Sequence, residues 1–414
     1  MKQLSNLFLF FLMSVLCACG SDEKGYQLKN YLEQVELLSP TSTQAPEVDN
    51  FVQTIKLSFP AGSDLTQVNL RFQVAPGVKM IQPETNEATL NLEKVDEIVL
   101  EYAGTQIRYK IKTASFYPAI NEVFTSWDRC SDFGELPPYL QIFKAPAGLL
   151  NKQLIAYIAV ADLNKGALFN ILGEAKGLAT PAEFYTANNE PKVIINAGYF
   201  WDNTALSMIC RNGKVIAPNL QVVTRSDGTA DANFYPTRAA FGKMADGKYK
   251  ATWTFTTVQG ATYAYPQPSP NKVGSKPQEV PSATFPAGAV AWNGETVIGG
   301  GPVLLKDGNY YNTWEAELYD ASSGIGPLIN NPRSAVGITK YNHLVFFVCE
   351  GRNKTPNVPG LTLEEVANIL KELGCVDAIN LDGGGSSCML ILGRETIKPS
   401  DGKQRAVSSC ITLN

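Results

Sequence analysis

Short segments with the two-residue alternation of β-strands recur along this chain of 414 residues, whereas few segments have the pattern of a capped helix. Apolar residues at every second position place one face of a strand against a core. This mixed order of strands and few helices favours an α+β fold over a doubly wound parallel sheet. The chain is 44% hydrophobic and 18% charged, as an ordinary globular protein is, which excludes collagen-like, coiled-coil and disordered chains.

The length predicts two domains, and the pattern changes near residue 115. Residues 1–18, with a positive start and a ten-residue apolar core, are predicted to be a lipoprotein signal peptide. Polar residues 19–50 are expected to be a tether with at most a short helix at 28–38. Within residues 51–115, apolar and polar residues alternate in short segments that are separated by turns, which predicts a small all-β, Ig-like sandwich. Residues 118–414 form the larger domain, for which we expect mixed or antiparallel sheets with a few helices.

The segment after the apolar core predicts how the chain is anchored. Leu16-Cys17-Ala18-Cys19 resembles the lipobox of bacterial lipoproteins, whose final cysteine becomes the acylated first residue. Cys19 is therefore the expected lipid anchor, with ordinary secretory cleavage as the alternative. The apolar core is too short to span a bilayer. We expect an exported lipoprotein held at the outer membrane, at the cell surface or in the periplasm.

The single histidine restricts metal chemistry. His343 opens an apolar run that predicts a buried strand, and it is expected to be structural. A three-His zinc site, an HExxH protease helix and a two-His, one-carboxylate iron site cannot form with one imidazole. No cofactor is expected, although a structural divalent metal stays open and its ligands are unknown. A formal charge of −4 does not predict the basic surface that binding of nucleic acid requires. Six further cysteines are compatible with disulfides or with buried free thiols: Cys130, Cys210, Cys349, Cys375, Cys388 and Cys410.

Two helix starts and several buried strands are predicted in the larger domain. Thr180 and Thr362 each precede a Glu three residues later, the signature of a capping box. Apolar runs at 155–163, 193–195 and 376–381 predict strands. The last of these runs ends in a turn that carries chemical groups.

That turn contains one carboxylate, three glycines and two serines. The glycines after Asp382 allow the backbone to approach a ligand closely, and their N–H groups can form an anion-binding concavity. Ser386 and Ser387 add hydroxyl donors. A flexible hairpin turn is the alternative.

Two other strand ends carry candidate residues. Arg333 follows Pro332 and offers the bidentate fork that suits phosphate, or it is a surface arginine. Glu350 follows an apolar strand and is a candidate acid, base or nucleophile, or an exposed loop residue. Arg238 and Arg333 each begin an R-x-A-x-G pattern, a match too short to establish a repeat.

Five segments resemble the phosphodiester glycosidase family and occur in the order found there. They are Ile195–Phe200, Gly299–Gly308, Asn331–Gly337, Gly360–Leu363 and Asn380–Ser387. The resemblance covers about residues 150–414 and leaves the N-terminal 115 residues outside. The family often has Asn-Gly-Gly-Phe-Phe where this chain has Asn-Ala-Gly-Tyr-Phe, and Asp-Gly-Arg where it has Glu-Gly-Arg.

The resemblance implies a hydrolase that cleaves an N-acetylglucosamine-1-phosphodiester-like substrate at the glycosidic C–O bond. Free sugar and a phosphate monoester would be released, and a phosphate leaving group has less need of a general acid. Asp382, Glu350 and Arg333 are the implied catalytic residues, with one carboxylate acting as nucleophile or as base. The implied substrate or phosphate contacts are Asn196, Gly198, Arg238, Gly301, Asn380, Gly383, Gly384, Gly385, Ser386 and Ser387.

Two other functions remain open. A surface glycan-binding lipoprotein without turnover would keep the fold but not the activity. A metal-assisted phosphodiesterase would cut the P–O bond, with Asp382 as a ligand. The expected partners are a phosphodiester-linked glycan and the outer membrane, without nucleic acid.

Overall fold

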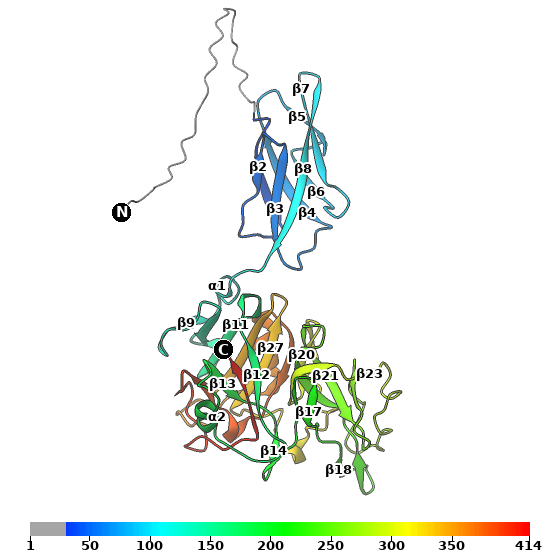
Figure 1. The fold of residues 1–414 in the computed structure, drawn as a ribbon, viewed down its shortest axis with the longest axis vertical. Coiled ribbons are helices and arrows are strands. Elements are labelled where there is room, and N and C mark those ends of the chain that lie inside the picture. The colour runs from blue at the N-terminus through cyan, green and yellow to red at the C-terminus, as the bar shows by residue number, and fades with distance from the viewer. Residues whose placement is uncertain (1–29) are drawn as a thin grey trace, which may run out of the picture. The chain divides into compact units, whose positions relative to one another are not determined.

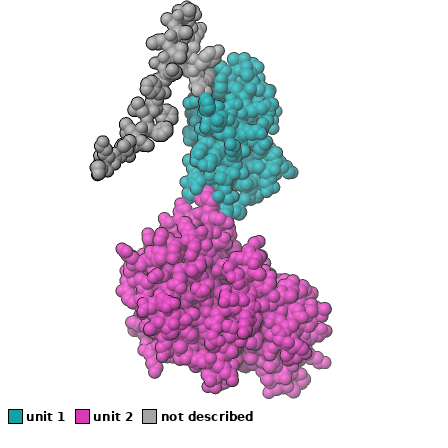
Figure 2. Space-filling view, in the orientation of Figure 1, with its two compact units in different colours: residues 1–115 teal, residues 116–414 magenta. Residues whose placement is uncertain are grey.

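The computed structural model describes residues 30–414, which fall into two compact units divided at Ser115 (Figure 2). The expected signal peptide and Cys19 lie outside the described residues. No helix between residues 30 and 414 is long and apolar enough to cross a membrane.

The first unit consists of two β-sheets around their own core. One sheet has the order β1 (Leu32–Ser39), β4 (Val68–Val74), β6 (Glu87–Leu90). The other has the order β2 (Glu47–Asp49), β3 (Thr54–Pro60), β8 (Thr105–Phe116), β7 (Glu97–Tyr102), β5 (Lys79–Gln82). Buried side chains such as Leu57, Phe72 and Tyr109 join the two sheets.

The expectation of a tether through residue 50 is wrong, because β1 and β2 belong to this first unit. β1 pairs antiparallel with β4, and the register shifts between Leu32 and Gln34. Such a bulge inserts one extra residue, so Leu32 and Val35 both face the core although they are three positions apart. Spacing of three is helical spacing, which explains the expectation of a short helix there.

The second unit, Phe116–Asn414, contains three large sheets whose neighbouring strands are all antiparallel (Figure 1). The eight-stranded sheet has the order β26 (Asn309–Tyr310), β25 (Val303–Lys306), β29 (Cys375–Asn380), β27 (Arg333–Thr339), β28 (His343–Cys349), β11 (Ala156–Asp162), β10 (Leu140–Lys144), β9 (Asp128–Cys130). The seven-stranded sheet has the order β17 (Lys214–Ala217), β16 (Ile209–Arg211), β24 (Gly294–Gly299), β20 (Arg238–Met244), β21 (Tyr249–Thr256), β22 (Thr262–Tyr265), β23 (Val290–Ala291). The five-stranded sheet has the order β12 (Phe169–Gly173), β32 (Ser409–Leu413), β13 (Val193–Asn196), β30 (Met389–Ile391), β31 (Arg394–Glu395). Two hairpins, β14 (Phe200–Trp201) with β15 (Thr204–Ala205) and β18 (Val223–Ser226) with β19 (Asp231–Phe234), complete the unit.

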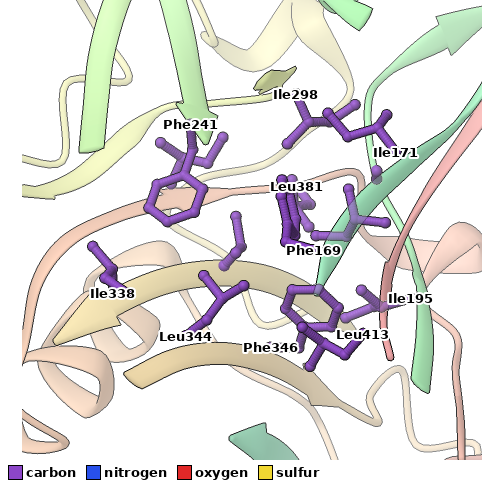
Figure 3. Close-up of a cluster of buried hydrophobic side chains, with 14 of the residues drawn as sticks. Phe169, Ile171, Ile195, Phe241, Ile298, Ile338, Leu344, Phe346, Leu381 and Leu413 are labelled. Carbon is purple, nitrogen blue, oxygen red and sulfur yellow. The ribbon is translucent and has the colours of Figure 1, made fainter. Parts of the chain in front are cut away.

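One hydrophobic core joins these three sheets. Figure 3 shows Phe241 of the seven-stranded sheet, Phe346 of the eight-stranded sheet and Leu413 of the five-stranded sheet in the same cluster. Leu381 also lies in this cluster, immediately after β29. Because Leu381 is fully buried, the core fixes the strand end from which the following residue, Asp382, departs.

Helices are few, and the two predicted capping boxes are confirmed. The three α-helices of the second unit are α1 (Ile120–Val123), α2 (Pro181–Ala187) and α3 (Leu363–Glu372). Thr180 caps α2 and Thr362 caps α3, each with reciprocal bonds to a glutamate three residues on. Antiparallel sheets with few helices are therefore confirmed for the second unit.

The cysteines between residues 30 and 414 are all free thiols, and all but Cys130 are buried. Of the two alternatives for these residues, the structure contains buried thiols and no disulfide in its described part. His343 is buried in the eight-stranded sheet, as expected of a structural residue.

Candidate active site

A cavity of about 260 Å³ in the second unit gathers the strand ends that the sequence singled out. Arg238 is the first residue of β20 and Arg333 the first residue of β27, and both line the cavity. The turn at Asp382–Gly385 lines it as well. Aromatic and apolar side chains complete the wall: Tyr199, Phe200, Trp201, Leu206, Leu220, Val223, Tyr319 and Ile325.

Asp382 is the only acidic residue that lines this cavity within residues 30–414. Its backbone N–H donates to the carbonyl of Ala197 at 2.8 Å, and its own carbonyl accepts the Asn196 amide at 2.6 Å. Burial raises the pKa of Asp382 to about 6, against a hydrogen bond from Ser386 and the positive charge of Arg405. The carboxyl group therefore titrates close to neutral pH, as a catalytic acid, base or nucleophile often does.

Five arginines line the same cavity as this carboxylate and make the cavity positively charged: Arg225, Arg238, Arg333, Arg352 and Arg405. Two of them have acidic partners outside the lining. Nε of Arg225 donates to Asp320 at 2.7 Å. Nε of Arg405 donates to Asp401 at 3.0 Å. Counting these two aspartates and Asp382 against the five arginines leaves an excess of two positive charges.

Arg238 places its positive charge in the wall of the cavity. Its side chain is 7% exposed, and its guanidinium carbon lies 4.2 Å from the centroid of the Tyr319 ring. Nε has no hydrogen-bond partner within the described chain. Nε is itself buried, so stacking fixes the guanidinium and an anion in the cavity would meet its terminal nitrogens instead.

Arg333 has a different role from the phosphate fork that the sequence suggested. Its Nε donates to the carbonyl of Leu361, Nη1 to Ile325, and Nη2 to Gly326 and Ile329, at 2.6 to 3.0 Å. A guanidinium has five N–H donors, so at most one remains for a ligand. The segment before β27 turns back over Arg333 and occupies the fork, which makes Arg333 a brace for one cavity wall.

Two of the three glycines let arginine side chains approach the turn. A Cβ at Gly384 would lie 2.7 Å from Nη2 of Arg352, and one at Gly385 would lie 2.1 Å from Nη2 of Arg405. We expected the backbone N–H groups of this turn to be free to bind an anion. Those of Gly384, Ser386 and Ser387 already donate to carbonyls, so they are not free. The turn therefore serves the site mainly by admitting two guanidinium groups.

Glu350 does not line the cavity, which corrects the expectation of a second catalytic carboxylate. It follows β28 and is 1% exposed. One oxygen accepts the backbone N–H of Lys398 at 3.3 Å, and the other has no partner among the described residues. The chain leaves the strand after Cys349 and Arg352 has a φ of 55°, so the strand alternation no longer applies and Arg352 reaches the cavity although Glu350 does not.

Most of the other expected contact residues support the site from behind. Asn196 is fully buried, accepts bonds from Ser334 and the amide of Cys388, and donates to the carbonyl of Asp382. Asn380 is also buried and donates to the carbonyls of Gly301 and Leu381. The remaining predicted residues that do not line the cavity are Gly198, Gly301, Ser386 and Ser387, and among these Ser386 accepts a bond from Arg405.

Several lining residues were not predicted from the sequence. Tyr199 stands where the family often has Phe, and its hydroxyl donates to the carbonyl of Gly301 at 2.6 Å. Its ring packs 5.4 Å from that of Tyr319, whose hydroxyl donates to Gly300. The departure at Tyr199 was visible in its motif. Tyr319, Arg225 and Arg405 lie in no motif, so only the fold brings them to the cavity.

Within residues 30–414 no three side chains of His, Cys, Asp or Glu gather closely enough to hold an ion.

Comparison with known proteins gives a partial match at the sequence level. A mouse N-acetylglucosamine-1-phosphodiester alpha-N-acetylglucosaminidase is 33% identical over 113 residues, which is 26% of this chain and 21% of the mouse protein. A prophage-derived uncharacterized protein of Bacillus subtilis, YomE, is 33% identical over 86 residues, 21% of this chain and 13% of YomE. The chain thus matches about a fifth or less of the length of these relatives.

Two solved structures are also similar. A hypothetical protein from Synechocystis has a TM-score of 0.44 at 14% identity, over 84% of this chain and 77% of that one. The catalytic domain of zebrafish N-acetylglucosamine-1-phosphodiester alpha-N-acetylglucosaminidase, auto-inhibited by its pro-peptide, has a TM-score of 0.43 at 20% identity, over 70% and 86%. The sequence model of the phosphodiester glycosidase family matches residues 189–413, which is more than half of the chain and includes every residue that lines the cavity, and the chain therefore belongs to that family.

Proposed function

We propose that this cavity hydrolyses a sugar-1-phosphodiester at the bond between the anomeric carbon and oxygen. The observation that carries the proposal is the single carboxylate, Asp382, among five arginines. An ordinary glycosidase pairs two carboxyl groups, because its alcohol leaving group must be protonated. A phosphate leaves without that help, so one carboxylate and several cations suffice.

The charge of the cavity fits the product of that cleavage. Breaking the C–O bond converts a singly charged diester into a phosphate monoester that carries up to two negative charges. The excess of two positive charges matches this dianion better than it matches the substrate. Interactions that strengthen as charge develops lower the barrier, which is the role we propose for Arg238 and Arg352.

Asp382 attacks the anomeric carbon or takes the proton of the attacking water. Both roles need the ionised carboxylate, so both predict activity that rises as Asp382 loses its proton. The anomer formed first separates them, since attack by Asp382 leads to retention and attack by water to inversion.

We propose N-acetylglucosamine as the sugar, because the mouse relative bears that substrate in its name. The expectations for the N-terminal part are kept as proposals. The first unit acts as an Ig-like accessory or spacer module, and Cys19 is acylated and holds the protein at the outer membrane. Mass spectrometry of the membrane fraction tests the acylation, and an unmodified Cys19 would contradict it.

The test of activity is incubation of the protein with an N-acetylglucosamine-1-phosphate methyl ester, followed by NMR. Free sugar plus methyl phosphate, absent in Asp382→Asn and strongly reduced in Arg238→Ala, is the expected result. A release of sugar 1-phosphate would instead mean P–O cleavage and a phosphodiesterase.

Binding without turnover, detected by calorimetry, would favour a glycan-binding protein. Leu168→Ala is the matched control, because Leu168 is 59% exposed and does not line this cavity.

A further inference from the structure

Two large apolar side chains lie exposed next to each other in the first unit. Phe51 is 77% exposed and Val52 is 56% exposed. They belong to the turn between β2 and β3, and neither is part of the core of this unit. Single exposed apolar residues are ordinary, but an adjacent pair in one turn keeps apolar surface in water that a partner would bury.

The turn that carries the pair is firmly held. Oδ1 of Asp49 accepts the backbone N–H of Phe51 at 2.9 Å and that of Val52 at 3.1 Å. The side chain of Asn50 accepts the N–H of Leu32 at 3.2 Å and donates to the carbonyl of Leu32 at 2.9 Å. The turn is thus fastened to the first residue of β1, and its backbone presents the two apolar side chains outward.

The turn lies at the end of the unit where the chain enters. Asn30, the first described residue, lines the same surface groove as Phe51. The ring of Tyr31 lies 5.7 Å from that of Tyr102, and Tyr102 pairs with Thr105 at the start of β8. From there β8 runs the length of the unit to the point where the chain leaves it (Figure 1). The apolar pair therefore belongs to the entrance end of the first unit.

The length of chain before this end decides which surface the pair can reach. Under the proposed acylation of Cys19, on which this inference rests, Leu32 follows the lipid by thirteen residues. Thirteen residues span at most about 45 Å when fully extended. The entrance end thus stays within that distance of the bilayer, and such a tether gives even a weak contact a high effective concentration.

A bilayer suits the pair better than a second copy of the chain does. A stable protein interface buries about 800 Å² on each partner, more than two side chains supply. A lipid anchor, by contrast, needs only a small second contact to hold a protein in one orientation. Lys112 is exposed in the groove that Phe51 lines and forms no salt bridge within residues 30–414, so its charge is available to lipid phosphates.

We propose that Phe51 and Val52 insert into the lipid surface to which Cys19 holds the protein, with Lys112 at the level of the headgroup phosphates. The first unit then stands on the bilayer on its entrance end.

The test places one tryptophan at each end of the first unit, which has none of its own between residues 30 and 115. The acylated protein is reconstituted in vesicles of phosphatidylethanolamine and phosphatidylglycerol, with or without bromine on the acyl chains. Bromine quenches indole rings that lie near it. The fluorescence that Phe51→Trp adds to the wild-type signal is expected to fall about twofold in brominated vesicles, at the depth that interfacial side chains reach.

Gln67→Trp is the matched control and is expected to add fluorescence that bromine does not quench. Gln67 is exposed and directly precedes β4. This end of β4 pairs with Ser39, the last residue of β1, and so lies at the end of the unit remote from Leu32.

Flotation of the wild type with the vesicles is measured first, because a protein that does not float contradicts the acylation of Cys19 and the inference with it. If the protein floats but Phe51→Trp is not quenched, the inference fails while the acylation stands. Equal quenching of Phe51→Trp and Gln67→Trp would mean that the unit adsorbs without a preferred end. If the emission of Phe51→Trp moves to the blue only as protein concentration rises, without quenching, a second copy covers the pair and the bilayer does not.

Discussion

The guanidinium of Arg238 lies over the ring of Tyr319, 4.2 Å from its centroid, and the Tyr319 hydroxyl donates to the carbonyl of Gly300 at 2.7 Å. This relationship fixes a cation in a buried wall without a carboxylate to neutralise it. Within residues 30–414 no acidic side chain forms a salt bridge with Arg238, whereas Arg225 and Arg405 have such partners.

Arg238→Lys is therefore expected to lower kcat/KM on a sugar-1-phosphodiester by about 10- to 100-fold. A lysine keeps the charge but loses the planar stack on Tyr319 and the forked geometry of the guanidinium. Steady-state kinetics on the methyl ester measures the loss. Arg394→Lys is the matched control, because Arg394 lies over Phe133 at 5.3 Å and does not line the cavity. Equal losses in both variants would argue against a direct role for Arg238.

The pH dependence of activity is expected to follow Asp382. Burial raises its pKa to about 6, so kcat/KM should fall about tenfold per unit as pH drops below that value. Ser386→Ala removes a hydrogen bond that lowers this pKa, so the acidic limb of the plot of kcat/KM against pH should move to higher pH. A limb that stays in place in Ser386→Ala, or a profile that instead falls above pH 6, would contradict an ionised Asp382 as the reacting group.

Stability should respond to the same carboxyl group with the opposite sign. The folded pKa of Asp382 lies above its ordinary value of 3.8, so the folded state binds the proton more tightly than the unfolded state does. The contribution of Asp382 to stability is present below 3.8 and is lost as pH rises through about 6. Asp382→Asn is expected to have a higher Tm than the wild type at pH 8, with a smaller difference at pH 4. Thermal melts at the two pH values check this expectation.

Arg333→Lys is expected to destabilise the second unit by about 3 kcal/mol, because a lysine cannot serve the four carbonyls that the guanidinium binds. Denaturant unfolding followed by tryptophan fluorescence measures this unit alone, since all five tryptophans lie beyond residue 116. KM should also rise, because Ser323, Gly324 and Ile325 of the braced segment line the cavity. If Arg333→Lys leaves the stability unchanged but weakens phosphate binding, Arg333 contacts the phosphate directly, as the sequence suggested.

Local signals in the sequence were sufficient for several elements. The caps at Thr180 and Thr362 satisfy backbone groups within one turn of helix, so their effect depends on no distant residue. The Asp382 turn was likewise recognisable, because an acidic residue, three glycines and two serines follow a buried strand. Arg238 was assigned to the ligand from its motif, and it does line the cavity.

The errors arise where structure depends on contacts that no local pattern records. The bulge after Leu32 gives a strand the spacing of a helix. The donors of Arg333 are used by a segment that folds back upon it, which a pattern at Pro332 does not reveal. Glu350 was assigned by its place at a strand end, but the face on which it lies depends on the register of β28. Arg225 and Arg405 come from distant parts of the chain, so only the sheet order brings them together.

The glycine run gives a final prediction, which concerns the placement of Arg352. Gly384 has a φ of 58°, a conformation that L residues with side chains adopt at a cost, and its Cβ position lies 2.7 Å from Nη2 of Arg352. Gly384→Ala is expected to cost about 1 kcal/mol in stability and to displace the flexible guanidinium from the cavity. KM should then rise about tenfold, and the pH dependence set by Asp382 should move slightly to higher pH, because the charge of Arg352 lowers that pKa. Gly247→Ala is the control for the backbone cost, since Gly247 has a φ of 80° and nothing within 4 Å of its Cβ position. If both variants lose equal stability and Gly384→Ala keeps the wild-type KM, the turn is not what places Arg352 against the phosphate.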